Sequence, residues 1–197
     1  IVPIGEWVMR EACRQAVAWR DAGLPPVVMS VNLSGVQFMR GDVERAVIDA
    51  LNESTLHPAQ LELELTESIL IQDTEAVLAA VSGLKALGVR LSIDDFGAGY
   101  SSFSYLKRFT VDRLKIDQSF VRDLAIDQDS AAIVRAIIQM AHSLDLHTVA
   151  EGVEDEKVLQ HLQALHCDQV QGFYFAKPMP AADLATYLAN MKHTVGV

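Results

Sequence analysis

The sequence predicts an α/β protein built on a parallel sheet, and three observations support this fold class. Short apolar segments alternate along the chain with amphipathic segments of helical period. Half of the 197 residues are hydrophobic, which is enough to bury a substantial core. The sequence shows no long linker, low-complexity tract or internal repeat. We therefore expect a single domain over residues 1–197, with helices covering both faces of the sheet.

The first expected element is an amphipathic helix over residues 6–22. Short buried strands follow it at 25–34, 61–65, 89–93, 112–117, 146–152 and 168–172. Further helices are expected because apolar residues recur three and four positions apart at 74–87, 129–144, 154–165 and 181–191. Gly88 follows one of these segments as a helix stop. Strands that alternate with crossover helices pair in parallel.

Both an open doubly wound sheet and a (β/α)8 barrel of the TIM type alternate strands with helices. Neither GxGxxG nor GxxxxGK[ST] occurs, which weakens the nucleotide-binding, open-sheet option. The chain begins inside the helix at 6–22, with no preceding strand to complete that unit. We therefore expect a modified (β/α)8 barrel whose N-terminal strand or strands are missing from this chain.

The composition narrows the partners and the compartment. A formal charge of −10 makes bare nucleic acid and anionic membranes poor partners unless a cation intervenes. No apolar run is long enough to span a bilayer, and the start of the chain lacks the basic leader of a signal peptide. Cys13 and Cys167 form no CxxC motif and are interpreted as free thiols. We therefore expect a cytoplasmic protein, although absent domains of a longer parent could tether it to a membrane.

Polar side chains occur at the predicted ends of all six strands. Because the carboxyl ends of parallel strands lie on one face, where barrels place their active sites, we expect these side chains to converge. In chain order they are Asn32, Glu64 and Glu67, Asp94 and Asp95, Lys115 and Asp117, Glu151 and Glu154, and Gln171.

Adjacent carboxylates repel each other, so Asp94 and Asp95 indicate a divalent cation between them and their neighbours. Oxygen atoms of Asn32, Glu64 and the two aspartates are the ligands that Mg²⁺ and Mn²⁺ prefer. Two ions could share this set, as in two-metal phosphate chemistry, and Lys115 would position an anion or a nucleophilic water. Each residue alone also has an ordinary explanation as a helix cap, a turn or a surface group. Their occurrence at every strand end favours the functional interpretation.

Six segments together resemble the EAL-domain family. They are VNLS (31–34), ELTES (64–68), DDFGAGYSS (94–102), KID (115–117), AEGVE (150–154) and QGFYFAKP (171–178). Their order and spacing match the family from residue 1 nearly to the C-terminus. The resemblance implies a modified (β/α)8 barrel that hydrolyses the bacterial second messenger cyclic di-GMP to the linear dinucleotide pGpG. It also implies dependence on Mg²⁺ or Mn²⁺, with two ions in the site.

The resemblance assigns a role to each matching residue. Asn32, Glu64, Asp94 and Asp95 match metal ligands, and Glu151 matches a further carboxylate of the metal and water network. Lys115 matches the lysine that holds the attacking water, so the expected catalytic residues are Lys115, Glu151 and Asp95. Supporting or substrate-binding roles fall to Glu67, Glu154, Gln171, Gln37 and Ser34, with Glu67 steadying the following loop and guanine contacts expected at Gln37 and over 172–178. The loop residues Phe96, Gly97, Gly99, Tyr100 and Ser101 match a region implicated in dimerisation and in coupling to regulatory domains.

One departure from the family concerns its name-giving Glu-Ala-Leu, which does not occur in residues 1–197. We expect this motif upstream of residue 1, in a longer chain that also carries a sensor or a GGDEF-type diguanylate cyclase domain. The truncated chain itself is then expected to be a poor catalyst. Expected partners are cyclic di-GMP and a second copy of the chain in a homodimer.

The main alternative function is a receptor that holds cyclic di-GMP without cleaving it. Family members of this kind usually lack metal ligands, whereas every ligand position within this chain is filled, which favours the enzyme. A barrel metalloenzyme acting on enolates through Mg²⁺ and a lysine is a second alternative. A purely structural fragment is a third. The complete motif series argues against the second alternative, and the polar strand ends argue against the third.

Overall fold

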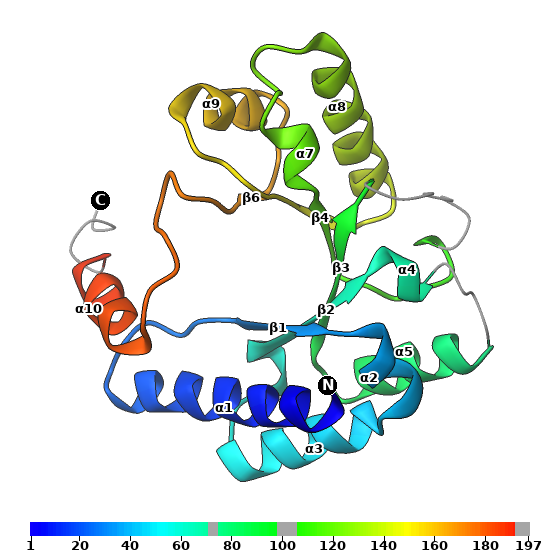
Figure 1. The fold of residues 1–197 in the computed structure, drawn as a ribbon, viewed down its shortest axis with the longest axis vertical. Helices are drawn as coiled ribbons and strands as arrows, with labels where there is room; N and C mark the ends of the chain where they lie inside the picture. Colours follow the sequence, from blue (N-terminus) through cyan, green and yellow to red (C-terminus); the bar gives the residue numbers. More distant parts are fainter. Residues whose placement is uncertain (71–74, 98–105, 192–197) are drawn as a thin grey trace. The chain divides into compact units, whose positions relative to one another are not determined.

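The structure is a computed structural model that describes residues 1–70, 75–97 and 106–191 (Figure 1). Six strands pair in one sheet, in the same order as in the sequence. Lys115 lies opposite Val149, and Ala150 lies opposite Val170, in parallel pairings. The predicted α/β class with a parallel sheet is confirmed. The strands are β1 (Met29–Leu33), β2 (Leu61–Thr66), β3 (Arg90–Phe96), β4 (Arg113–Ile116), β5 (His147–Ala150) and β6 (Gln169–Val170).

The chain forms two compact units. The first contains Ile1–Leu63, Gly83–Arg90 and Pro178–Val197, and the second contains Glu64–Ser82 and Leu91–Lys177. Strand β2 passes from one unit to the other, and its first five residues are all buried. Burial of successive residues means that both faces of this strand are covered, as in a parallel sheet. Within the described ranges, no helix is both long enough and apolar enough to cross a membrane.

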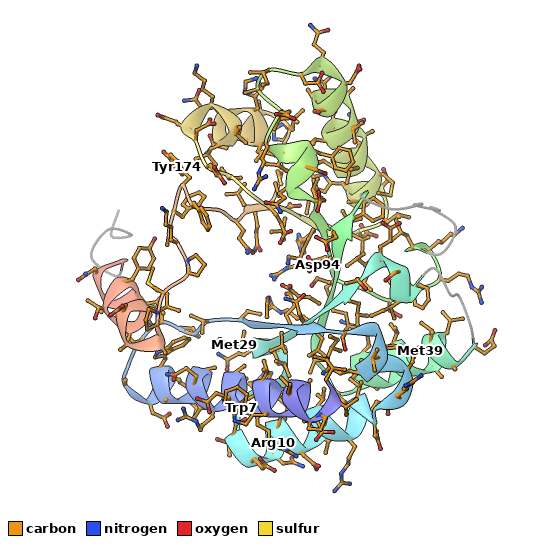
Figure 2. All side chains as sticks on the ribbon, viewed as in Figure 1. Trp7, Arg10, Met29, Met39, Asp94 and Tyr174 are labelled. Atoms are coloured by element: carbon orange, nitrogen blue, oxygen red, sulfur yellow. The ribbon has the colours of Figure 1, made fainter. Side chains whose placement is uncertain are left out.

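The helices α1 (Val2–Asp21) and α3 (Val43–Ser54) pack against each other in the first unit. Met9 and Cys13, four residues apart on α1, are almost completely buried, which is the pattern of an amphipathic helix. Trp7 lies on the other face of α1 and is 64% exposed (Figure 2). The helix predicted at 6–22 is therefore present and begins four residues earlier.

Of the other helices in the first unit, one was predicted from the sequence and three were not. The helix α10 (Ala181–Met191) has the predicted bounds. The helices α2 (Gly35–Arg40) and α3 and the short 3-10 helix at Pro58–Gln60 were not predicted. The helix α2 has only six residues, and in α3 only Val47 and Ala50 are buried, so neither presents a long apolar stripe.

In the second unit, polar caps start the helices. Asp117, Asp127 and Asp155 each precede a helix and accept a backbone hydrogen bond from its first turn. Asp117, which was counted among the strand-end residues, is therefore a helix cap. The helices of this unit are α4 (Glu67–Leu70), α7 (Gln118–Val121), α8 (Gln128–Ser143) and α9 (Glu156–Ala164), whereas α5 (Glu75–Ala86) has residues in both units.

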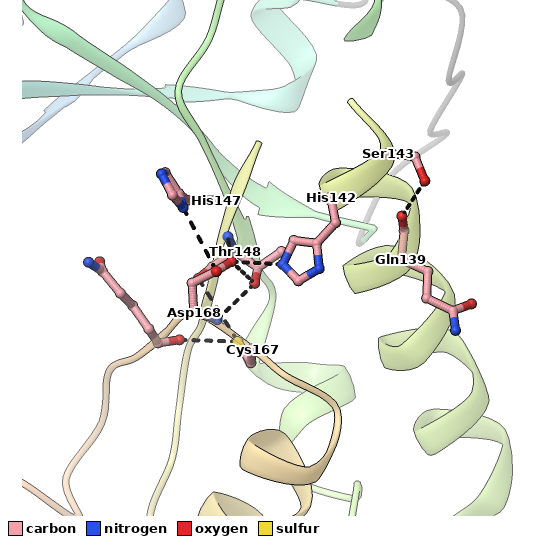
Figure 3. Close-up of polar contacts among 8 residues, drawn as sticks. Gln139, His142, Ser143, His147, Thr148, Cys167 and Asp168 are labelled. Carbon is pink, nitrogen blue, oxygen red and sulfur yellow. Dashed lines mark hydrogen bonds and ion pairs between the residues drawn. The ribbon is translucent and has the colours of Figure 1, made fainter. Parts of the chain in front are cut away.

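A network of hydrogen bonds around Asp168 fixes the start of β6, which has only two residues. The Asp168 carboxylate accepts hydrogen bonds from the Thr148 N–H at 2.8 Å, the Thr148 hydroxyl at 2.8 Å and His142 Nε2 at 2.9 Å (Figure 3). The Asp168 N–H in turn donates to the Thr148 hydroxyl at 3.2 Å. One carboxylate therefore ties β6 to β5 and to the end of α8, just upstream of Gln171.

This hydrogen-bond network favours the ionised form of Asp168. Partial burial works against ionisation, but the hydrogen bonds from Thr148 and His142 outweigh it and lower the pKa of Asp168 to about 2. The usual value in an unfolded chain is about 3.9. Because the folded-state pKa is the lower one, the carboxylate stabilises the fold above the unfolded value. This contribution disappears as the pH falls through the folded value.

We expect Asp168→Ala to lower the free energy of unfolding at pH 7 by about 2–3 kcal/mol, the size that this pKa difference implies. The difference in the free energy of unfolding between the variant and the wild type should decrease as the pH falls from about 4 to about 2. Urea denaturation followed by circular dichroism at pH 7, 4 and 3 measures it. Asp123→Ala, at an exposed position after α7, is the matched control. A difference that stays constant over this range would contradict the stabilising role of the ionised carboxylate.

Candidate metal centre

A buried lysine lies at the centre of the site. Lys115 Nζ is 2.8 Å from Glu64 Oε2, 2.7 Å from Asp94 Oδ1 and 2.7 Å from Glu151 Oε1. Its side chain is 6% exposed. These residues come from β2, β3, β4 and the loop that follows β5, which are neighbours in the sheet. The convergence predicted from the strand ends therefore holds for these four residues, all of which belong to the second unit.

The charges of this cluster do not balance. Burial lowers the pKa of Lys115, but its hydrogen bonds to Asp94, Glu151 and Glu64 raise it well above the ordinary value. Burial raises the pKa of Glu151, and the charges of Asp94 and Glu64 act in the same direction against the opposing effect of Lys115. One ammonium thus faces three carboxylates. A cation bound beside them would compensate the remaining negative charge.

The backbone of β3 explains how two adjacent aspartates serve one site. Side chains of consecutive strand residues normally point to opposite faces. Here the register with β4 shifts between Ile93 and Phe96, and Asp95 has a φ of 53°, in the left-handed region. Carboxylate oxygens of Asp94, Asp95 and Glu151 consequently all lie within 4.8 Å of one another. The strand runs on to Phe96, so the two aspartates lie within it, whereas the sequence placed them at its end.

The oxygens gathered by this bulge fit a hard divalent cation. Mg²⁺ and Mn²⁺ prefer carboxylate and amide oxygens, and this cluster offers no histidine or cysteine among the described residues. Burial, together with the charges of Asp94 and Asp117, also raises the pKa of Asp95. Both the donor chemistry and the excess negative charge therefore fit a metal site.

Glu67 contacts the first residue of the loop that follows β3. It is the first residue of α4, is 5% exposed, and accepts a hydrogen bond from the Gly97 N–H at 3.4 Å. Gly97 has a φ of 98°, and a Cβ there would lie 2.9 Å from the Phe120 ring. Phe96 is buried. The other predicted loop residues, Gly99, Tyr100 and Ser101, lie outside the described residues.

Glu154 and Gln171 line a cavity of about 220 Å³ together with Glu151. Glu151 therefore borders both this cavity and the lysine cluster. Arg122 and Phe173 line the same cavity, and the sequence interpretation did not single them out individually. In the sequence, Arg122 is an isolated arginine seven residues after Lys115. An isolated arginine is too common to predict a site.

Asn32, Ser34 and Gln37 belong to the first unit. Asn32 is exposed on β1, one residue before its end. Ser34 caps α2, and the Gln37 side chain accepts hydrogen bonds from the Ser34 N–H at 3.1 Å and from its hydroxyl at 2.8 Å. This reciprocal capping box leaves Gln37 only 7% exposed. In this structure Gln37 thus has a local structural partner, in addition to any contact that it makes with a ligand.

Comparisons with known proteins place these observations in a family. The family model described as the EAL domain matches residues 1–178. The bifunctional diguanylate cyclase/cyclic di-GMP phosphodiesterase MucR of Pseudomonas aeruginosa is 47% identical over 189 residues. The match covers 96% of this chain and 28% of MucR. The chain therefore spans about a quarter of the length of this curated relative.

Two solved structures are similar in fold as well as in sequence. The structure described as PaMucR phosphodiesterase in complex with c-di-GMP is 48% identical with a TM-score of 0.89, over 93% of this chain and 74% of that one. The EAL domain of Mycobacterium smegmatis DcpA is 40% identical, also with a TM-score of 0.89, over 94% and 84%. This similarity confirms the predicted fold class, an α/β fold of the modified (β/α)8 type. The chain belongs to the EAL-domain family.

Proposed function

We propose that this chain is a metal-dependent phosphodiesterase domain that hydrolyses cyclic di-GMP to pGpG in bacterial second-messenger signalling. The observation that carries the proposal is the contact of Lys115 with Glu64, Asp94 and Glu151, next to the carboxylate of Asp95. This arrangement supplies both an oxygen-rich cation site and a fixed positive charge. The names of MucR and of its complex with c-di-GMP support the choice of substrate.

In this proposal Glu64, Asp94, Asp95 and Glu151 would hold Mg²⁺ or Mn²⁺ in a two-ion site. For Asn32, the role of a metal ligand is proposed from its match to the family alone. When bound, the ions would polarise the phosphodiester and lower the pKa of a water molecule. Lys115 stays protonated at neutral pH because its pKa is raised by its carboxylate partners. Its ammonium would hold the three carboxylates in place through its three N–H donors. Its positive charge would also offset the negative charge that grows on the phosphate oxygens in the transition state.

The remaining expectations concern the protein as a whole. We propose that it carries a diguanylate cyclase or sensor domain beside this one, as the name of the longer relative MucR suggests. We also propose a homodimer that uses the loop beginning at Phe96 and Gly97. The contact between Glu67 and Gly97 supports a role for Glu67 in holding the start of that loop.

Incubation of the longer chain that we expect to carry the Glu-Ala-Leu motif, with cyclic di-GMP and Mg²⁺ or Mn²⁺, tests the activity. We expect pGpG as the product, detected by liquid chromatography, and no product when EDTA removes the metal. Adding back Mg²⁺ or Mn²⁺ in excess should restore product formation. Binding of cyclic di-GMP without any product in either metal would favour the receptor alternative. A chain that neither binds nor cleaves cyclic di-GMP would contradict the proposal.

A further inference from the structure

We propose that Arg122 is a specificity-determining residue that contacts a guanine base of the substrate at the edge carrying O6 and N7. The inference rests on the proposed function, because it takes cyclic di-GMP as the substrate. It concerns the cavity of about 220 Å³ lined by Arg122, Glu154, Gln171 and Phe173. Arg122 belongs to none of the motifs that identify the family.

The position of the cavity links it to the reaction centre. Glu151 lines the cavity and also contacts Lys115 at 2.7 Å. Pockets that enclose a whole small molecule usually measure about 300–1,000 Å³. A cavity of about 220 Å³ is therefore suited to one part of a dinucleotide, such as a single base. The phosphodiester of the same molecule would then lie toward the metal cluster.

Two glycines fix the walls of this cavity. Gly152 has a φ of 72°, and a Cβ there would lie 2.6 Å from the Cβ of Gln118. A Cβ on Gly172 would lie 2.1 Å from the Val153 carbonyl oxygen. The Val153 N–H also donates to the Gln171 carbonyl at 3.0 Å. Close backbone packing therefore holds the loops after β5 and β6 and the α7 segment in place, and the cavity walls are preformed.

The guanidinium of Arg122 is oriented by a neighbour on α7, and its charge also helps to lower the pKa of the Asp117 carboxylate. Its Nη2 donates to Gln118 Oε1 at 2.8 Å, one turn earlier in the chain. No carboxylate of the described residues lies within ion-pair distance of it. Since an arginine has five N–H donors, this single hydrogen bond leaves others for a ligand. Arg122 is also the only lysine or arginine among the residues that line the cavity.

The donors and acceptors of the cavity match guanine better than adenine or phosphate. Arginine donates two hydrogen bonds to the O6 and N7 acceptors of guanine. Guanine also has two neighbouring donors, N1–H and an amino group. The carboxylate of Glu154 can accept hydrogen bonds from both of them. Adenine has an amino donor in place of O6 and an acceptor at N1, so both contacts would be mismatched. The carboxylates of Glu151 and Glu154 would repel a phosphate group in the same cavity.

Kinetics of Arg122→Ala, made in the longer chain that we expect to carry the Glu-Ala-Leu motif, test the inference. We expect KM for cyclic di-GMP to rise roughly tenfold to a hundredfold, the usual value of one bidentate base contact, with kcat within about twofold of the wild type. The inhibition constant of cyclic di-AMP against the same reaction should change less than about threefold, so the discrimination between the two dinucleotides collapses. Arg122→Lys should recover only part of the loss, because an ammonium cannot make the bidentate contact.

Arg135→Ala is the matched control, since Arg135 is exposed on α8 and lies outside this cavity. Circular dichroism of each variant verifies that the fold is kept. An unchanged KM in Arg122→Ala would overturn the inference, and so would a fall in kcat at constant KM. If the longer wild-type chain with the Glu-Ala-Leu motif did not cleave cyclic di-GMP, the proposed function would be contradicted instead, which separates the two failures.

Discussion

Replacing Lys115 by methionine is expected to abolish the hydrolysis of cyclic di-GMP and to destabilise the fold. Methionine keeps the length of the side chain but leaves Glu64, Asp94 and Glu151 facing one another without their shared cation. Removing one partner from a buried charge cluster costs about 3–5 kcal/mol. In the proposed mechanism the charge of Lys115 stabilises the reacting phosphate, and its loss is expected to lower kcat by roughly a hundredfold or more.

Two measurements check this expectation for Lys115→Met. The first is the rate of pGpG formation at saturating cyclic di-GMP, and the second is urea denaturation without metal. Lys157→Met, which removes an exposed lysine on α9, is the control and should leave both quantities unchanged. A variant that unfolds at the same urea concentration as the wild type would show that the carboxylates do not depend on the lysine. The ionic cluster would then contribute nothing measurable to stability.

Asp94→Asn in the full-length parent protein is expected to abolish the same activity while the fold persists. Asparagine keeps an oxygen that can accept from Lys115, so the structural contact survives, but it removes one anionic oxygen from the proposed metal site. Without metal, the variant loses a charge from a cluster where carboxylates outnumber cations, so its melting temperature should equal or exceed that of the wild type. Mn²⁺ should raise the melting temperature of the wild type but not that of the variant.

The activity and the melting temperature of Asp94→Asn, each with and without Mn²⁺, decide the question. Asp129→Asn, at an exposed position in the first turn of α8, serves as the control. More than a tenth of the wild-type activity in Asp94→Asn would show that this residue is not a metal ligand. The opposite effects on stability expected for Lys115→Met and Asp94→Asn make the pair informative even where both variants are inactive.

The strands and the cluster could be predicted because they depend on local patterns. Alternating apolar segments indicated all six strands, and the polar residues near their ends indicated Glu64, Asp94, Lys115 and Glu151 as neighbours. The geometry of Asp95 could not be predicted in this way. Its positive φ is uncommon for a residue other than glycine and accompanies the irregular pairing of β3 with β4, which is a tertiary property.

Other features escaped prediction for different physical reasons. The helix α3 buries too few residues to show a clear periodicity, so local pattern alone does not reveal it. The match to the family predicted a guanine contact for Gln37, but not the capping box that its side chain forms with Ser34. Arg122 is a single exposed arginine, and only the cavity around it distinguishes it from a solvated surface residue.

The shared lysine also restricts how this domain can change in evolution. Because Lys115 serves three acidic partners at once, its loss is expected to be damaging until at least one of those carboxylates has been neutralised. Neutralising Asp94 first is expected to preserve the fold and remove only the chemistry. The accessible mutational route from a hydrolytic enzyme to a ligand-binding receptor therefore starts at an acidic residue and reaches the lysine later. Descendants that have lost the lysine should also carry a neutral residue at one of the three acidic positions.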